Sequence, residues 1–82
     1  MKKIILEREK KDIINLYEIS EYTPIFAKMN NKLVGMVVQE NDHNYQWTLK
    51  LGGCINCSGI FDTREECMLS ANRYGYTFYI ED

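Results

Sequence analysis

Three cysteines and one histidine are the residues in this chain whose types and spacing could do chemistry most directly. Cys54 and Cys57 form a Cys-x-x-Cys arrangement, which can present two thiolates to one zinc ion. Cys67 would be the third ligand and His43 the fourth. Structural zinc sites are generally built from two separated ligand pairs, and the second pair is missing here. We therefore favour small, reduced cysteines over a metal site, and a zinc-stabilised structural domain stays as an alternative.

No other group of residues has the pattern of a catalytic centre. His43 lies beside Asp42 in a polar turn, with no nucleophile near it in the sequence. Ser58 lacks the strand–turn–helix setting that exposes a nucleophilic serine. The cysteine pair precedes a glycine and a strand, whereas a redox-active pair opens a helix. We expect a protein that is not an enzyme and that needs no cofactor.

The composition predicts a single folded domain over residues 1–82. Hydrophobic residues make up 45% of the chain and charged residues 27%, and both values are ordinary for a globular protein. The net charge of −2 lacks the basic excess that is typical of nucleic-acid-binding domains. Glu7 interrupts the apolar start too soon for a secretory signal, and no apolar run is long enough to cross a membrane. We expect a cytoplasmic protein whose cysteines are reduced.

Acidic residues are the main candidates for a binding surface. Carboxylates follow one predicted strand, open a predicted helix and end the chain, and such a group can complement a basic groove on a partner protein. Leu69 is expected to point outward from the helix, and Tyr79 adds a side chain type that is favoured at interfaces. The predicted partner-binding surface consists of Glu40, Asp42, Asp62, Glu65, Glu66, Leu69, Tyr79, Glu81 and Asp82.

The C-terminal half contains the best-marked elements. A helix is predicted over residues 63–74, because Asp62 or Thr63 can cap its first turn and Gly75 suits the position after its end. Strand 76–80 follows the helix. Together with residues 60–61 it would complete a right-handed crossover. The helix is expected to pack on a sheet through Arg64, Cys67, Met68, Ala71 and Tyr74.

Residues 25–29 and 32–40 are predicted to pair as a hairpin. Asn30-Asn31 between them can take the positive φ values that a two-residue turn needs. This turn would align Ala27 with Val34. Gly35, one residue later, would leave room for an aromatic ring or mark a bulge.

Strand 45–51 has the clearest alternation in the chain, and a loop over residues 52–59 is favoured after it. A tight Gly52-Gly53 turn would pair Trp47 with Ser58 and bring polar side chains to the core. The core-facing residues of the strand are predicted to be Tyr45, Trp47, Leu49 and Leu51, and the opposite face would carry Gln46, Thr48 and Lys50.

Residues 13–22 fit two structures. A helix capped by Asp12 and ended before Pro24 is favoured. The rival is a hairpin of residues 3–8 with 13–19, since periodicity alone does not settle short apolar runs. The fold expected from the whole chain is an α+β domain with about four antiparallel strands, helix 63–74 packed on them, and an N-terminal helix.

Residues 45–74 resemble the sheet-plus-helix of AP2-type and integrase arm-binding DNA domains. In those families a Phe-x-Thr-x-x-Glu-Ala turn opens the helix. The matching residues here are Phe61, Thr63, Glu66 and Cys67, with cysteine in place of alanine. The resemblance implies that the sheet would read DNA, through positions that are rich in arginine and lysine in those families. The corresponding residues here are Gln46, Thr48 and Lys50.

In general character the chain also resembles small phage-encoded accessory proteins, including inhibitors of host defence such as anti-CRISPR proteins. That resemblance implies stoichiometric binding to a larger enzyme in the host cytoplasm. Our leading hypothesis is therefore an inhibitor or adaptor that binds a protein with a basic groove. The alternatives are a nucleic-acid-binding domain that uses the sheet face and the zinc-stabilised domain. A monomer and a homodimer paired through strand 76–80 are both open.

Overall fold

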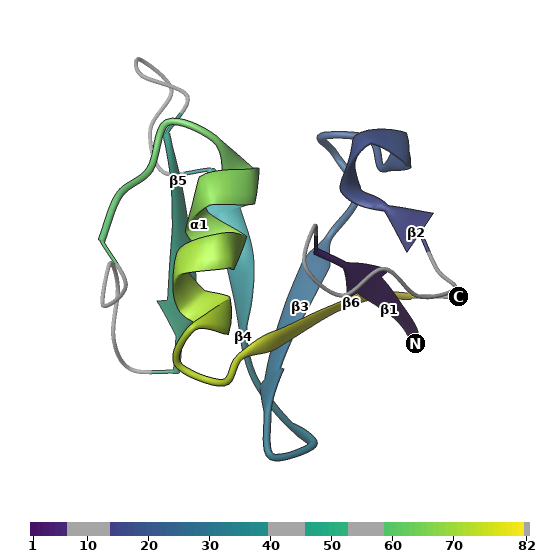
Figure 1. Ribbon diagram of the computed structural model, residues 1–82, viewed down its shortest axis with the longest axis vertical. Coiled ribbons are helices and arrows are strands. Elements are labelled where there is room, and N and C mark those ends of the chain that lie inside the picture. Colours follow the sequence, from purple (N-terminus) through teal and green to yellow (C-terminus); the bar gives the residue numbers. More distant parts are fainter. Residues whose placement is uncertain (7–13, 40–45, 53–58, 82) are drawn as a thin grey trace.

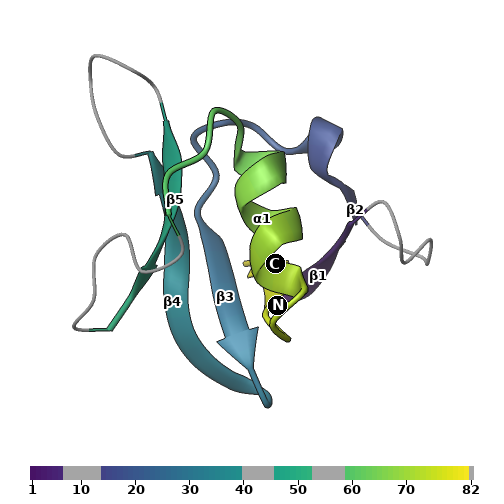
Figure 2. The ribbon, with the colours of Figure 1, turned by 60° about the vertical axis from the view of Figure 1, so that its left-hand side comes forward.

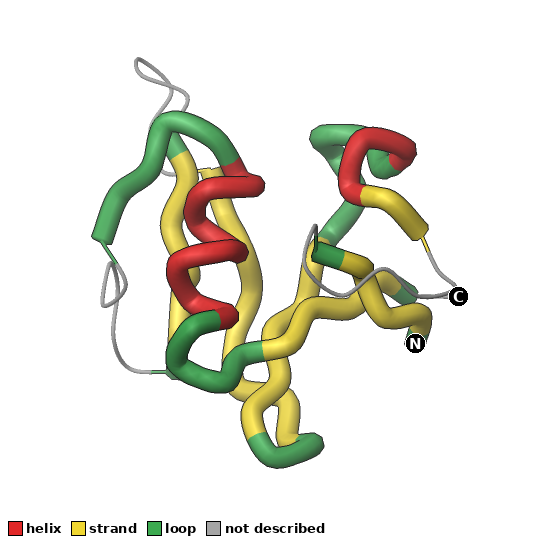
Figure 3. Tube along the Cα trace, in the orientation of Figure 1, coloured by secondary structure: helices red, strands yellow, loops and turns green. Residues whose placement is uncertain are grey.

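The computed structural model describes residues 1–6, 14–39, 46–52 and 59–81. These residues form one six-stranded sheet, one α-helix and one short 3₁₀ helix (Figures 1 and 3). The elements in chain order are β1 (Lys2–Ile5), β2 (Ile14–Asn15), η1 (Leu16–Glu18), β3 (Ile25–Met29), β4 (Lys32–Gln39), β5 (Trp47–Leu51), α1 (Arg64–Asn72) and β6 (Thr77–Ile80). The predicted α+β class is confirmed, and β1 and β2 enlarge the sheet beyond the four strands that the sequence predicts.

The strands follow the order β2–β1–β6–β3–β4–β5. Every pair of neighbours in the series β1–β6–β3–β4–β5 is antiparallel, whereas the edge strand β2 runs parallel to β1. The sheet curls, so that α1 lies with β4 and β5 on one side and β1 and β2 on the other (Figures 1 and 2). We call the side of the sheet that faces α1 its inner face, and the opposite side its outer face.

The hydrophobic core lies between α1 and the inner face. The helix contributes Cys67 and Met68, and β5 contributes Leu49, all 0% exposed. Phe78 of β6 is also buried and therefore points to the inner face. Because side chains alternate along a strand, its neighbours in the sequence point to the outer face. The complete cluster is Ile4, Leu6, Leu16, Ile19, Ile25, Ala27, Val37, Leu49, Cys67, Met68, Ala71 and Phe78.

Helix α1 has a defined cap at each end. The Thr63 hydroxyl accepts a hydrogen bond from the Glu66 amide at 3.1 Å, so Thr63 rather than Asp62 is the N-cap. At the other end the amides of Gly75 and Tyr76 donate to the carbonyl oxygens of Asn72 and Ala71, at 3.1 and 3.4 Å. These two bonds form a Schellman motif around Gly75, whose φ is 100°. Both caps agree with the predicted helix, although its regular part ends at Asn72.

The buried face of α1 corresponds in part to the predicted one. Cys67, Met68 and Ala71 are buried as expected. Tyr74, predicted to face the sheet, is 76% exposed because it lies beyond the last helical turn. Leu69, predicted to point outward, is half-buried and packs against the core, because the curled sheet covers the helix over a wide arc.

The β3–β4 hairpin forms at the predicted turn with a register that changes by one residue. Asn30 and Asn31 have φ values of 52° and 65°, as a type I′ turn requires, and Met29 pairs with Lys32. Beyond the turn, Ala27 pairs with Gly35 instead of Val34, because the strands contain a β-bulge. The alignment of Ala27 with Val34 was therefore wrong, and Gly35 directly follows the bulged residue.

Strand β5 matches its prediction only on one face. Leu49 lies in the core, but Thr48 on the outer side is also 0% exposed. The Thr48 hydroxyl donates to the Gly59 carbonyl oxygen at 2.8 Å, so the chain after residue 58 covers this end of the outer face. Trp47 pairs with Phe61 through two backbone hydrogen bonds of 2.7 and 2.8 Å, rather than with Ser58 as a tight turn would require.

The predicted N-terminal helix over residues 13–22 does not form. Residues 14–15 instead pair with β1, in parallel rather than as the antiparallel hairpin of the rival prediction. The chain then makes the single turn of η1, which buries Leu16 and Ile19. Pairing with β1 satisfies backbone groups, and a helix of this length is only marginally stable by itself, so the pairing competes successfully with it.

Strand β6 is an interior strand. It pairs with β1 on one side and with β3 on the other. Pairing of two copies through residues 76–80, which the sequence left open, is therefore excluded, because both edges of this strand are already hydrogen-bonded. Among the described residues, no helix is long and apolar enough to cross a membrane.

Candidate functional site

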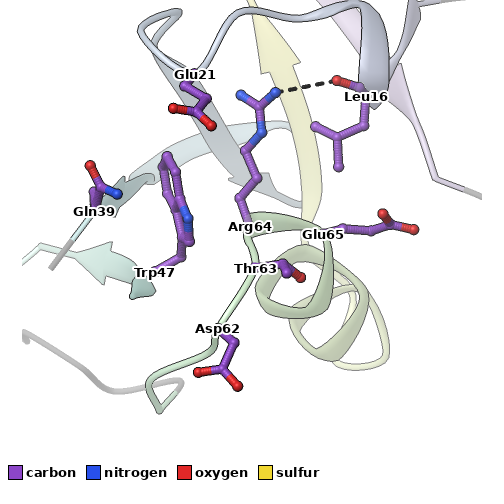
Figure 4. Close-up of a pocket in the computed structure, with 8 residues that line it drawn as sticks. All are labelled: Leu16, Glu21, Gln39, Trp47, Asp62, Thr63, Arg64 and Glu65. Atoms are coloured by element: carbon purple, nitrogen blue, oxygen red, sulfur yellow. Dashed lines mark hydrogen bonds between the residues drawn. The ribbon is translucent and has the colours of Figure 1, made fainter. Parts of the chain in front are cut away.

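A cleft of about 410 Å³ opens where the start of α1 meets the N-terminal segment and the start of β5. We call it the Arg64 cleft, because the Arg64 side chain extends across it from α1 toward Leu16 (Figure 4). Its volume lies within the range of small-ligand and side-chain pockets. The cleft is lined by Leu16, Glu21, Gln39, Trp47, Asp62, Thr63, Arg64 and Glu65.

Arg64 connects two distant parts of the chain across this cleft. Its guanidinium group donates to the carbonyl oxygens of Ser20 at 3.0 Å, of Leu16 at 3.3 Å and of Ile19. These carbonyl groups lie in and just after η1, and those of Leu16 and Ser20 also accept from the amides of Ile19 and Thr23, at 3.1 Å each. The planar guanidinium group offers several donors in a fixed geometry, which suits a cluster of this kind. Arg64 therefore fixes the cleft wall that carries Glu21.

Trp47 forms the opposite wall of the cleft. Its indole is half-buried, and the guanidinium carbon of Arg64 lies 6.0 Å from the ring centroid. At this distance the cation–π attraction is at its outer limit. The two backbone bonds between Trp47 and Phe61 hold the indole at the edge of the sheet. The tryptophan thus offers an aromatic ring edge beside the carboxylates of the cleft.

Three carboxylates line the Arg64 cleft, and they come from two separate segments. Glu21 follows η1, while Asp62 and Glu65 flank the start of α1. Asp62 is exposed and accepts a hydrogen bond from the Gln46 side chain at 3.3 Å. Glu66 is exposed just beyond the cleft. Since the Thr63 hydroxyl caps the helix and Arg64 binds backbone carbonyls, the carboxylates are the groups best placed to attract a cation.

The structure separates the predicted partner-binding residues into several groups. Asp62 and Glu65 line the Arg64 cleft and Glu66 lies next to it. Glu81 follows β6 and does not line the cleft. Leu69 packs against the core. The remaining predicted residues, Glu40, Asp42 and Asp82, lie outside the described residues.

Tyr79 lies apart from the carboxylates of the Arg64 cleft. It follows the inward-facing Phe78, so its side chain is on the outer face of the sheet. The Lys28 ammonium nitrogen lies 4.5 Å from the centroid of its ring. The Thr77 hydroxyl donates to the Tyr79 hydroxyl oxygen at 3.3 Å. The carboxylates of the Arg64 cleft and Tyr79, predicted as one surface, thus lie on different surfaces of the molecule.

Of the four candidate zinc ligands, the structure describes only Cys67. Cys67 is 0% exposed in the core beside Met68. Cys54, Cys57 and His43 lie outside the described residues. Within the described ranges, no three histidine, cysteine or acidic side chains gather closely enough to hold a metal ion.

The sequence did not indicate that three residues belong to the cleft, namely Glu21, Trp47 and Arg64. It also did not indicate that Arg64 connects two segments. Trp47 was assigned to the core and Arg64 to the sheet-facing side of the helix. A signal was available for Arg64, because a cation in the first turn of a helix is disfavoured by the helix dipole. An arginine at such a position indicates a specific contact elsewhere. Its partners are backbone carbonyls, which leave no signature in the sequence.

Comparison with known proteins yields no relative: the chain matches no protein-family model, no curated protein and no solved structure.

Proposed function

We propose that this protein is a non-catalytic binding module that holds a basic surface of a larger protein at the Arg64 cleft. The observation that carries the proposal is the meeting of Glu21 and Asp62 at one cleft beside Trp47. These carboxylates are far apart in the sequence, and the Arg64 bridge brings their segments together. A lysine or arginine side chain of a partner would find carboxylates and an aromatic ring in the same place.

The geometry supports binding more than catalysis. The cleft offers hydrogen-bond acceptors and negative charge, while its hydroxyl and guanidinium groups are already engaged in holding the fold. Complementary charge raises the association rate and selects the partner. A basic groove that binds nucleic acid is the kind of partner surface that fits this charge. Occupation of such a groove would inhibit a nucleic-acid-processing enzyme stoichiometrically, as phage-encoded inhibitors of host defence do.

A charge-reversal series tests this proposal. The purified chain is immobilised, proteins of a bacterial lysate are captured on it, and the captured protein is then purified and titrated against each variant by calorimetry. Glu21→Lys and Asp62→Lys should each weaken binding by about tenfold or more, as expected for charged groups within an interface. Glu81→Lys is the matched control, because it makes the same charge change at a residue that does not line the cleft.

Salt provides a second readout. Binding by wild type should weaken as ionic strength rises through the physiological range, where the Debye length falls to about 8 Å. A complex that forms in equimolar amounts, is sensitive to salt and is lost in both cleft variants supports the proposal. Equal binding by wild type, Glu21→Lys and Asp62→Lys contradicts it, and so does turnover of any substrate by the free chain at this cleft.

A further inference from the structure

The strands of the sheet have a charge pattern that the Arg64 cleft does not explain. The six strands contain five charged residues, and all five are lysines. Within residues 1–6, 14–39, 46–52 and 59–81, every aspartate and glutamate lies outside the strands. A chain with a net charge of −2 therefore concentrates positive charge on its sheet.

One continuous row of side chains crosses five strands on this face. Phe26 of β3 pairs with Tyr79 on one side and Met36 on the other, Tyr79 pairs with Lys3 of β1, and Met36 pairs with Lys50 of β5. Directly paired residues point to the same side of a sheet. Since Tyr79 is on the outer face, the whole row is on that face. Lys28 belongs to the next row, above the Tyr79 ring.

We call this surface the lysine–aromatic face, formed by Lys3, Phe26, Lys28, Met36, Lys50 and Tyr79. Lys50 is exposed and the other five are half-buried, so each of these residues is partly in contact with solvent. Phe26 and Tyr79 are direct cross-strand neighbours, with side chains about 5 Å apart at their bases. Helix α1 packs against β4 and β5 on the inner face, which is the side opposite to these residues.

We propose that the lysine–aromatic face binds single-stranded nucleic acid. Phe26 and Tyr79 would stack on bases, and Lys28 and Lys50 would neutralise phosphates beside them. Stacking on aromatic side chains combined with a basic surface is the general physical basis of single-strand binding without sequence preference. The strand must be single, because the bases of a duplex are stacked on one another and half-buried rings on a sheet cannot reach them.

The charges on this face disfavour two other occupants. A second copy placed face to face would bring lysines against lysines, and like charges in an interface are strongly unfavourable. A membrane surface would attract the lysines, but the half-buried rings of a sheet offer little apolar surface for insertion between lipids. Neither occupant uses the paired rings, whereas a single strand uses both the rings and the lysines.

Fluorescence anisotropy with a labelled oligothymidylate of about 12 nucleotides tests the proposal, since single domains commonly cover about 4–16 nucleotides. Wild type should bind at low salt, with a slope of log K against log salt of about −1.4 to −2.1 for two or three phosphates. Lys50→Glu should weaken binding about tenfold. Lys32→Glu is the matched control, because Lys32 pairs with Met29 on the inner side of the sheet. Glu21→Lys tests independence from the Arg64 cleft and should bind no more weakly than wild type.

The role of the ring is tested by two variants at one position. Tyr79→Phe keeps the ring and should bind like wild type, whereas Tyr79→Leu keeps apolar bulk and should bind at least about fivefold more weakly, in line with the loss of one stacked base. Thermal melting confirms that each variant is folded. The proposal is overturned if the oligonucleotide does not bind at low salt, if Lys50→Glu or Tyr79→Leu binds as well as wild type, if a duplex binds more tightly, or if anionic vesicles bind and the oligonucleotide does not.

Discussion

Arg64 donates a hydrogen bond to the carbonyl oxygen of Leu16 at 3.3 Å, and this contact joins the start of α1 to the end of the N-terminal strand pair. The same guanidinium group also reaches the carbonyl oxygens of Ile19 and Ser20. One side chain thus satisfies three backbone acceptors around η1. The position of Glu21, and with it the acidic character of the cleft, depends on this bridge.

Replacement of Arg64 should therefore destabilise the protein. Arg64→Met removes charge-assisted hydrogen bonds from partly buried carbonyl groups, and we expect a loss of about 1.5–3 kcal/mol in the free energy of unfolding. Arg64→Lys should lose less, since one ammonium group reaches fewer carbonyls. Urea denaturation measures both. Arg73→Met, at the exposed end of the helix, should change stability by about 0.5 kcal/mol or less. Equal effects at the two arginines would show that the carbonyl bridge contributes nothing.

The N-cap of α1 gives a second prediction. Thr63→Ala removes the acceptor for the Glu66 amide and should cost about 1 kcal/mol. Thr63→Ser keeps the hydroxyl and should lie within about 0.5 kcal/mol of wild type. Asp62→Ala is the comparison, because the sequence alone allowed either Asp62 or Thr63 to be the N-cap. A larger loss for Asp62→Ala than for Thr63→Ala, measured by thermal or urea unfolding, would assign the cap to Asp62 instead.

Gly35 should not tolerate any side chain. A Cβ atom at this position would lie 2.1 Å from the Lys50 carbonyl oxygen, so β4 and β5 would have to separate. We expect Gly35→Ala to cost about 3 kcal/mol or more, at the upper end of overpacking effects. Gly52→Ala is the control, because its Cβ meets no atom within 4 Å and its cost comes only from a positive φ. If the two variants unfold at the same urea concentration, the close approach of the strands is not a constraint.

The Asn30-Asn31 turn gives a prediction about backbone conformation. Asn31 has a φ of 65°, so Asn31→Val should cost about 1–2 kcal/mol, the penalty for a left-handed residue with a branched side chain. Asn31→Gly suits the same turn and should change stability by about 0.5 kcal/mol or less. Hydrogen exchange of the β3 and β4 amides offers a local check. Protection that is unchanged in Asn31→Val would argue against a type I′ turn.

Local signals in the sequence predicted the elements that local chemistry controls. Thr63 and Gly75 bound the helix as expected, because caps depend on residues within one turn. Asn30-Asn31 predicted its hairpin for the same reason. The buried residues Cys67, Met68 and Ala71 followed from helical spacing alone. The strand register beyond the turn could not be predicted in this way. The bulge lies next to Gly35, where β5 approaches β4 closely, and β5 is distant in the sequence from β3.

Tertiary contacts decided the N-terminal segment. Residues 13–22 have the composition of a short helix, yet residues 14–15 pair with β1 and the following turn is held by Arg64. Arg64 is remote in the sequence, so no local pattern could reveal its contact, whereas the rival hairpin did pair these two segments but in the antiparallel direction. The position of β6 between β1 and β3 also depends on remote segments, and it removed the edge that a dimer would have needed.

For the two candidate surfaces, too, the sequence determined some features and the tertiary structure determined others. The sequence by itself determined which residues carry charge and that acids surround the helix start. Only the tertiary structure decided which of them meet: Glu21 joined Asp62 at one cleft, and Tyr79 joined Lys28 on the far side of the sheet. The physical reason is that strand order and the curl of the sheet around α1 set these distances, and both depend on backbone pairing between segments that are distant in the chain.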